Sequence, residues 1–125
     1  MNIAMTSIFV NDPKQAFTFY TEVLGFVERL FMPEMNLAIV VSPEDQGGTG
    51  LLLEPNDNLG ADSFQAGLYA AGVPVIVFGT TDIHADYARL TARGVVFRKE
   101  PTATDYGILA TFEDTCGNLI QLLQT

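Results

Sequence analysis

The chain has little of what metal sites and disulfides are built from. Its 125 residues include one cysteine, Cys116, and one histidine, His84, and no tryptophan. A single cysteine excludes an internal disulfide and every multi-cysteine zinc site. A single histidine excludes any site that needs two histidines from one chain. These two counts argue against most zinc hydrolases and against three-histidine metal centres.

Positive charge is also scarce, because 6 Lys and Arg residues stand against 15 Asp and Glu, a formal net charge of −9. Nucleic acid is therefore not an expected partner, since binding phosphates requires a basic face. The negative field favours a cationic small ligand, although acidity often serves solubility alone. No apolar run approaches the ~20 residues of a membrane helix, and no basic segment followed by an apolar one opens the chain. We therefore expect a cytoplasmic protein without a membrane partner.

The hydrophobic residues make up 48% of the chain and are arranged in two similar halves. In the first half a strand over 3–10 precedes Asp12 and Pro13, which suit the start of a helix. Apolar positions recur at helical spacing up to Gly25, where the helix should end. Further strands are expected over 26–32, 37–41 and 51–54.

The second half repeats this plan at a nearly constant offset. The landmarks Asp82, Gly94 and Gly117 follow Asp12, Gly25 and Gly48 at almost the same spacing along the chain. The pattern predicts a helix that Asp82 caps and one turn marked by Pro101 and by Asp105-Tyr106-Gly107. Strands are expected over 73–79, 95–99, 108–112 and 119–123, and a short helix over 63–71 in the connection. A common offset of this kind indicates a duplicated βαβββ module.

The motifs of these modules resemble the vicinal oxygen chelate superfamily, which includes glyoxalase I, bleomycin resistance proteins and extradiol dioxygenases. The resemblance rests on Phe19-Tyr20 and Leu24-Gly25-Phe26 in the first half, and on the segment from Asp114 to Ile120 in the second. It implies an α+β fold of two βαβββ modules that form an incomplete, U-shaped sheet around a cavity. It also implies a single domain over 1–125, with repeats of about 1–58 and 70–125, and a homodimer.

Enzymes of this superfamily hold a divalent metal inside the cavity. The resemblance places the four ligand positions on Met5, Leu52, Val75 and Gln121. Two aliphatic side chains, a thioether and a neutral amide are a poor set for a divalent ion, which prefers imidazole, carboxylate or several oxygens. We therefore predict no metal and no cofactor. If the register slips, Glu54 becomes a candidate ligand, but one carboxylate and one amide still make a weak site.

Strand alternation predicts which side chains face the cavity. The predicted ligand-binding set is apolar with a few polar points, the usual pattern of a small-molecule site. Its members are Met5, Ser7, Phe9, Leu52, Glu54, Val75 and Gln121, with Tyr106 at the rim. His84 and Cys116 are interpreted as structural, in a helix start and a turn.

These residues favour a metal-independent binding protein that resembles the bleomycin resistance proteins and sequesters an organic ligand, cationic or aromatic. One alternative is a glyoxalase-like lyase or isomerase that uses Glu54 or an unrecognised group. Burial of Glu54 among leucines would favour its protonated form and suit it to act as a base. The other alternative is a non-catalytic homologue whose cavity is filled by its own side chains.

Overall fold

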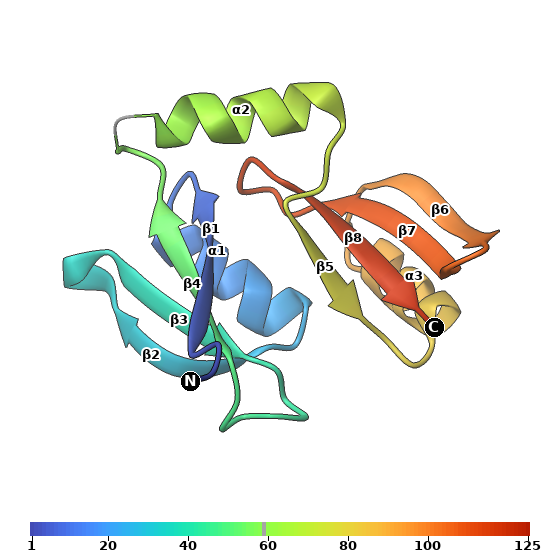
Figure 1. The fold of residues 1–125 in the computed structure, drawn as a ribbon, viewed down its shortest axis with the longest axis horizontal. Helices are drawn as coiled ribbons and strands as arrows, with labels where there is room; N and C mark the ends of the chain where they lie inside the picture. The colour runs from blue at the N-terminus through green and yellow to red at the C-terminus, as the bar shows by residue number, and fades with distance from the viewer. Residues whose placement is uncertain (59) are drawn as a thin grey trace. The chain divides into compact units, whose positions relative to one another are not determined.

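The computed structural model describes residues 1–58 and 60–125 and has an α+β fold, as predicted. The chain divides into two compact units, Met1–Gln65 and Ala66–Thr125. Each unit contains a strand, a helix and three further strands in that order (Figure 1). The four strands of each unit form one mixed sheet, and neither sheet closes into a barrel.

The first unit contains β1 (Met5–Val10), α1 (Pro13–Thr18), β2 (Val27–Met32), β3 (Leu37–Val41) and β4 (Gly50–Pro55). Its strand order is β1-β4-β3-β2, with β1 parallel to β4 and the other pairs antiparallel. A parallel pair needs a long crossover, which α1, β2 and β3 supply here.

Helix α1 begins where the sequence predicts. The Asp12 carboxylate accepts the backbone N–H of Lys14 at 3.0 Å, and Pro13 occupies the first turn. The expected helix is continuous, but its second part is a π-helical segment, η1 (Phe19–Val23). The helical stretch ends before Gly25, whose φ of 92° favours glycine. Phe17 of α1 stacks on Phe31 of β2 at 4.0 Å, so the helix covers one face of the first sheet.

The second unit contains β5 (Ile76–Gly79), α3 (Ile83–Ala92), β6 (Phe97–Thr104), β7 (Gly107–Glu113) and β8 (Leu119–Gln124). Its strand order, β5-β8-β7-β6, repeats that of the first unit, and β5 is parallel to β8. Helix α2 (Ala61–Ala71) contains the boundary between the units. The repeated order confirms the duplicated βαβββ plan.

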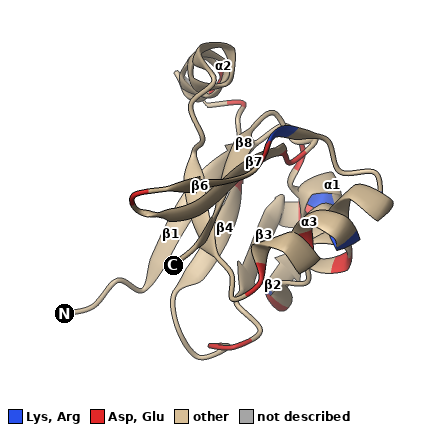
Figure 2. Cartoon of the chain, turned by 90° about the vertical axis from the view of Figure 1, so that its right-hand side faces the viewer, with Lys and Arg blue, Asp and Glu red and all other residues tan. Residues whose placement is uncertain are grey.

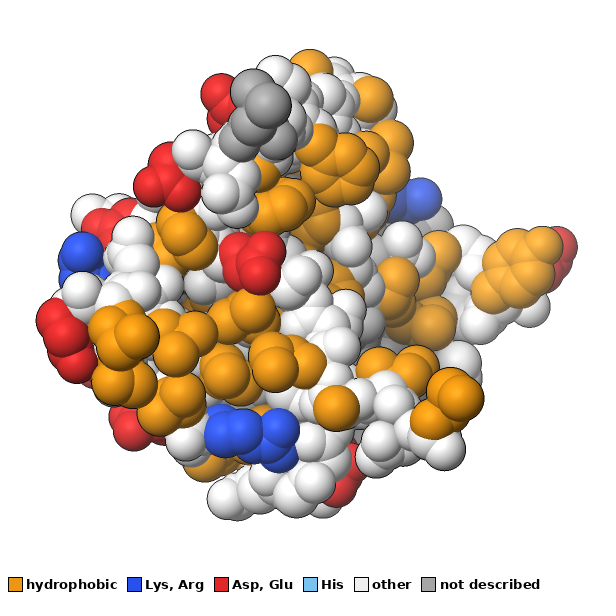
Figure 3. Space-filling view, turned by 60° about the vertical axis from the view of Figure 1, so that its left-hand side comes forward, with side chains coloured by type: hydrophobic (Ala, Val, Ile, Leu, Met, Phe, Trp, Pro, Cys, Tyr) orange, Lys and Arg blue, Asp and Glu red, His pale blue; other side chains and the backbone are white. Residues whose placement is uncertain are grey.

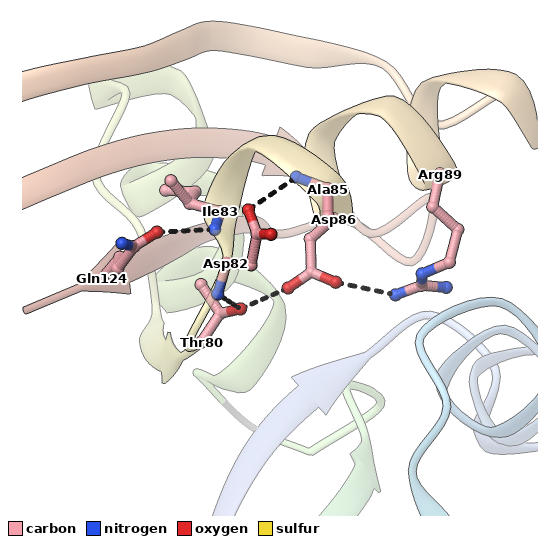
Figure 4. Close-up of polar contacts among 7 residues, drawn as sticks. All are labelled: Thr80, Asp82, Ile83, Ala85, Asp86, Arg89 and Gln124. Carbon is pink, nitrogen blue, oxygen red and sulfur yellow. Dashed lines mark hydrogen bonds and ion pairs between the residues drawn. The ribbon is translucent and has the colours of Figure 1, made fainter.

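The start of α3 is held by side chains from both of its flanks (Figure 4). The Asp82 carboxylate accepts the N–H of Ala85 at 3.0 Å, as its predicted capping role requires. Gln124 of β8 accepts the N–H of Ile83 at 2.7 Å. Thr80 accepts the N–H of Asp82 and donates to Asp86. The start of α3 is thus bonded to the end of β8.

Three expected boundaries were wrong. Pro101 does not end a strand, because β6 continues through it to Thr104. β6 is an edge strand with register shifts on both sides of Lys99, and a proline without an N–H is tolerated at such irregular edge positions. Helix α2 begins at Ala61, slightly earlier than predicted, and β5 begins at Ile76, so Val75 precedes it.

The two faces of the first sheet differ in burial. Ile8, Val10 and Leu53 on the helix-covered face are 5%, 0% and 0% exposed, whereas Met5 on the opposite face is 47% exposed. In the second unit Phe112 and Ile120 are buried in the same way under α3, and Val77 on the opposite face is 50% exposed. The core of each unit therefore lies between its helix and its sheet.

None of the helices within residues 1–58 and 60–125 is long and apolar enough to span a membrane. Acidic residues lie on turns such as the β3–β4 connection and the β6–β7 hairpin (Figure 2). Other charged residues lie within strands, among them Arg29 of β2 and Glu54 of β4.

Candidate functional site

Five of the predicted ligand-binding residues lie together on one face of the first sheet. In the parallel pair of β1 and β4, Ser7 is opposite Leu52 and Phe9 is opposite Glu54. Met5 is opposite Gly50 at the other end of the same pair. Because paired residues share a face and side chains alternate along a strand, all of these lie on the face opposite α1. We call this surface the open face of the first sheet.

The open face is mainly apolar. Phe9 and Leu52 are half-buried, Met5 is exposed, and Leu30 of β2, which is opposite Ile39 of β3, is 37% exposed. Figure 3 shows hydrophobic side chains gathered over this sheet, with acidic and basic side chains at the borders of the group. Small-molecule sites have a similar composition, with mainly apolar side chains and a few polar groups.

Glu54 is the acidic residue of the open face. The residue is half-buried, and its carboxylate makes no hydrogen bond or ion pair with any part of the chain that the structure describes. Its strand neighbour Phe9 meets Phe64 of α2 edge to face, with ring centroids 6.4 Å apart. A carboxylate next to aromatic rings is suited to an organic cation, which both groups attract.

A small polar network fixes this aromatic pair. Gln65, only 4% exposed, donates its Nε2 to the Phe9 carbonyl oxygen at 3.1 Å. Its Oε1 accepts the amide of Asn56 at 2.7 Å, and the same amide donates to Asn11 at 2.9 Å. Because Gln65 follows Phe64 in α2, these bonds hold the Phe64 ring beside Phe9.

Arg29 of β2 also belongs to the open face, although it was not predicted from the sequence. Its Nη2 donates to the carbonyl oxygens of Gln46 and Gly48 at 2.9 and 2.7 Å. A Cβ atom on Gly50 would lie 2.9 Å from Arg29 Nη1, so the guanidinium occupies the space above Gly50. The repeat is a signal that could have found it, since the offset that relates Gly25 to Gly94 also relates Arg29 to Arg98.

The remaining predicted residues lie in the second unit. Val75 donates its N–H to the Leu119 carbonyl oxygen at 3.0 Å, just before β5. Gln121 of β8 is opposite Val77 and Thr111, on the face of the second sheet away from α3. Tyr106 is 84% exposed in the β6–β7 turn. That these three share a site with the residues of the first unit stays a prediction.

A second polar group that was not predicted from the sequence lies in the second unit. Tyr69 of α2 donates its hydroxyl to Glu113 at the end of β7. Arg98 donates to the Tyr69 hydroxyl at 2.8 Å and to Glu113 at 3.2 Å, and its guanidinium lies 5.3 Å from the Tyr69 ring centroid. The hydrogen bonds from Tyr69 and Arg98 lower the pKa of Glu113, and those with Glu113 and Tyr69 raise the pKa of Arg98.

This pKa shift makes a prediction about acid stability. The pKa of Glu113 is lower in the folded chain than in the unfolded chain. Its contribution to the free energy of unfolding is therefore complete above the ordinary carboxyl pKa of about 4.3, and it is lost as the pH falls through the pKa of the folded state. We expect Glu113→Gln to lower the free energy of unfolding by about 1 kcal/mol at pH 7. Urea denaturation should show the two proteins converging toward pH 3, and parallel curves over the whole range would contradict the prediction.

The four positions at which the resemblance places metal ligands carry side chains that do not suit a divalent ion. Met5, Leu52 and Val75 offer no oxygen or nitrogen, and Gln121 offers one neutral amide. Within residues 1–58 and 60–125, no three His, Cys, Asp or Glu side chains are grouped to hold a metal. The donor set of this chain therefore supplies no carboxylate or imidazole at the four positions.

His84 and Cys116 lie at a helix start and in a turn, as predicted. His84 is exposed in the first turn of α3, two residues after the cap Asp82. Cys116 is buried in the β7–β8 turn, where its N–H donates to the Asp114 carboxylate at 2.7 Å. Neither residue belongs to the open face of the first sheet.

The fold defines a class of α+β proteins built from a duplicated βαβββ module. The family model for the Glyoxalase/Bleomycin resistance protein/Dioxygenase superfamily matches residues 2–122, nearly the whole chain. The chain belongs to this superfamily, which confirms the resemblance of its motifs.

Relatives and solved structures agree with this membership. The chain is 46% identical to YurT, an uncharacterized protein of Bacillus subtilis (strain 168), over 99% of both chains. It is similar to the crystal structure of UcmS2, with a TM-score of 0.81, 28% identity, and coverage of 98% of this chain and 97% of the other. It is also similar to TnmS3, described as an antibiotic binding protein from Streptomyces sp. CB03234, with a TM-score of 0.75, 27% identity, and coverage of 99% and 95%.

Proposed function

We propose that this protein binds a small organic molecule on the open face of its first sheet, without a metal, and sequesters it. The observation that carries the proposal is Glu54, a half-buried residue whose carboxylate has no partner in the described chain and which has apolar and aromatic neighbours. A carboxylate in such surroundings gains most from a cationic group on a ligand that brings apolar surface with it.

Two further observations support binding in place of metal-dependent chemistry. The four positions that would hold an ion carry Met5, Leu52, Val75 and Gln121, which are poor ligands for one. TnmS3, a structural neighbour of similar length, is described as an antibiotic binding protein. In the second unit, Gln121, Val75 and Tyr106 are proposed to contribute to the same ligand.

The test is a thermal-shift screen followed by titration calorimetry. Cationic aromatic compounds, bleomycin among them, are compared with nickel, zinc and manganese salts. A ligand at a hundred times its Kd stabilises the folded state by about 2.7 kcal/mol, which gives a clear rise in Tm. We expect such a rise with organic cations and none with the metal ions. Stoichiometric metal binding, or no response to any organic compound, would contradict the proposal.

Charge removal at Glu54 should weaken binding selectively. We expect Glu54→Gln to raise the Kd for a cationic aromatic ligand about fivefold to tenfold, because it removes the charge that the cation meets. Glu22→Gln is the matched control, since Glu22 is an exposed glutamate on the helical segment η1 of the same unit. Titration calorimetry of both variants decides the point, and equal effects of the two substitutions would show that only net charge matters.

A lyase or isomerase is the second candidate, and the unpartnered Glu54 carboxylate is what favours it. A base at this position would remove a proton from a carbon of a bound compound and return it elsewhere. In D2O this exchange replaces a C–H by a C–D, which NMR of the bound compound detects. Exchange with the native protein and none with Glu54→Gln would identify an enzyme, and no exchange in either would leave binding as the function.

The assembly and location belong to the same proposal. We infer a homodimer of single-domain chains in the cytoplasm, with repeats of about 1–58 and 70–125, as the superfamily resemblance implies. Light scattering with size-exclusion chromatography measures the mass directly, and a value of 13.6 kDa, that of one chain, would contradict the dimer.

A further inference from the structure

Two arginines occupy equivalent positions in the two modules but have different partners. Arg29 and Arg98 are related by the repeat offset, and each lies in the strand that follows the module's helix. Arg98 is paired with the Glu113 carboxylate at 3.2 Å. Arg29 instead donates to two carbonyl oxygens, and within residues 1–58 and 60–125 no carboxylate forms an ion pair with it. The charge of Arg29 is therefore not neutralised.

The position of the Arg29 guanidinium is fixed on the open face. Nη2 is held by the turn carbonyls of Gln46 and Gly48, and Nη1 lies over Gly50. The same point above Gly50 is 3.0 Å from Cγ2 of Ile39, so the guanidinium meets apolar surface there. A cation anchored by two neutral acceptors and bordered by apolar groups is well suited to bind an acidic ligand group.

Arg29 and Glu54 mark two ends of one strand face. Gly50 and Glu54 are four residues apart on β4, which separates them by about 13 Å. Leu52 lies between them on the same face, opposite Ser7 of β1 and Ile39 of β3. The open face therefore presents a cation, an apolar middle and a carboxylate in that order.

We propose that the ligand carries an acidic group that binds Arg29 and a cationic group that binds Glu54, joined by an apolar body that lies over Leu52. This inference rests on the proposed function and narrows it from organic cations to molecules that carry both charges. The long-range field of a chain with net charge −9 would favour the cationic group alone. We include an acidic group in the proposed ligand because the Arg29 guanidinium on the open face has no carboxylate to neutralise it.

The test uses two dyes that differ in one charge. Rhodamine B carries a carboxylate and a delocalised cation on an aromatic frame, and its ethyl ester lacks only the free carboxylate. Fluorescence anisotropy measures the Kd of each dye for the native protein, Arg29→Met, Arg29→Lys and Glu54→Gln. Lys14→Met, which removes an exposed cation on α1, is the control for net charge.

We expect the native protein to bind rhodamine B about fivefold more tightly than the ester. Arg29→Met should bring this ratio to one, while Arg29→Lys and Lys14→Met should keep it. Glu54→Gln should weaken both dyes equally. Circular dichroism confirms that the variants fold.

The outcomes separate this inference from the proposed function. If neither dye binds the native protein saturably, the proposed function and this inference fail together. If both dyes bind and Glu54→Gln weakens both, but Arg29→Met leaves the ratio unchanged, only the role of Arg29 fails. If the native protein binds both dyes with the same Kd, the proposal that the ligand carries an acidic group also fails.

Discussion

Replacing Asp114 with alanine is expected to lower the free energy of unfolding by about 4 kcal/mol, a large share of a small protein's stability. Asp114 is fully buried in the β7–β8 turn. Its carboxylate accepts the N–H of Cys116 at 2.7 Å, and the N–H and side-chain amide of Asn118 at 3.0 and 2.9 Å. Alanine removes the acceptor of all three bonds, and a buried donor that loses its acceptor costs about 1–3 kcal/mol.

The backbone of the β7–β8 turn cannot easily rearrange to compensate for the lost carboxylate. Thr115 has a φ of 62° and Gly117 a φ of 99°, so the backbone is in a left-handed conformation at two points. The N–H of Asp114 itself donates to the Asn118 carbonyl oxygen at 3.1 Å and closes the turn. The carboxylate therefore holds a backbone that a β-branched residue such as Thr115 adopts only under strain.

Chemical denaturation at pH 7 measures this effect, and Asp105→Ala is the matched control. Asp105 is an exposed aspartate in the β6–β7 turn of the same unit, so its replacement should change the free energy of unfolding by about 0.5 kcal/mol or less. A variant Asp114→Ala that stays within about 1 kcal/mol of the native protein would refute the argument.

The second large effect compares neighbouring leucines on opposite faces of β4. Leu53 is fully buried on the side of α1, whereas Leu52 is half-buried on the open face. We expect Leu53→Ala to cost about 3–4 kcal/mol, because it leaves a cavity in a packed core. Leu52→Ala should cost about 1 kcal/mol, since its side chain already meets water.

Ligand binding should respond in the opposite order. Leu52→Ala removes apolar surface from the proposed site and should raise the Kd for a bound dye about threefold to tenfold, while Leu53→Ala should leave it near the native value at temperatures where the variant is folded. Denaturation curves and dye titrations of the two variants check both expectations. Equal stability losses would mean that Leu52 is packed as tightly as Leu53. Weaker dye binding by Leu53→Ala alone would mean that the ligand does not bind over Leu52.

Much of the fold could be predicted because its signals are local. Asp12 and Asp82 cap helices through bonds to residues two or three positions away, and Gly25 and Gly94 take the left-handed conformations expected at helix ends. Alternation along β1 and β4 predicted correctly that Ile8 and Val10 face the helix. The predicted turn is confirmed at Asp105 and Tyr106 but was wrong at Pro101, because an edge strand with shifted register accommodates a proline without ending.

Part of the candidate site could also be predicted, and part could not. The duplicated module and the faces of its strands could be predicted from the sequence, because they depend on spacing within one element or on the repeat offset. The four metal positions came from the superfamily resemblance, and their side chains are read directly from the sequence. The partners became known from the folded structure: Glu113 is paired with Tyr69 and Arg98, and Arg29 lies over Gly50. Such contacts join residues far apart in the chain, and their geometry depends on how strands and turns pack, which no local pattern encodes.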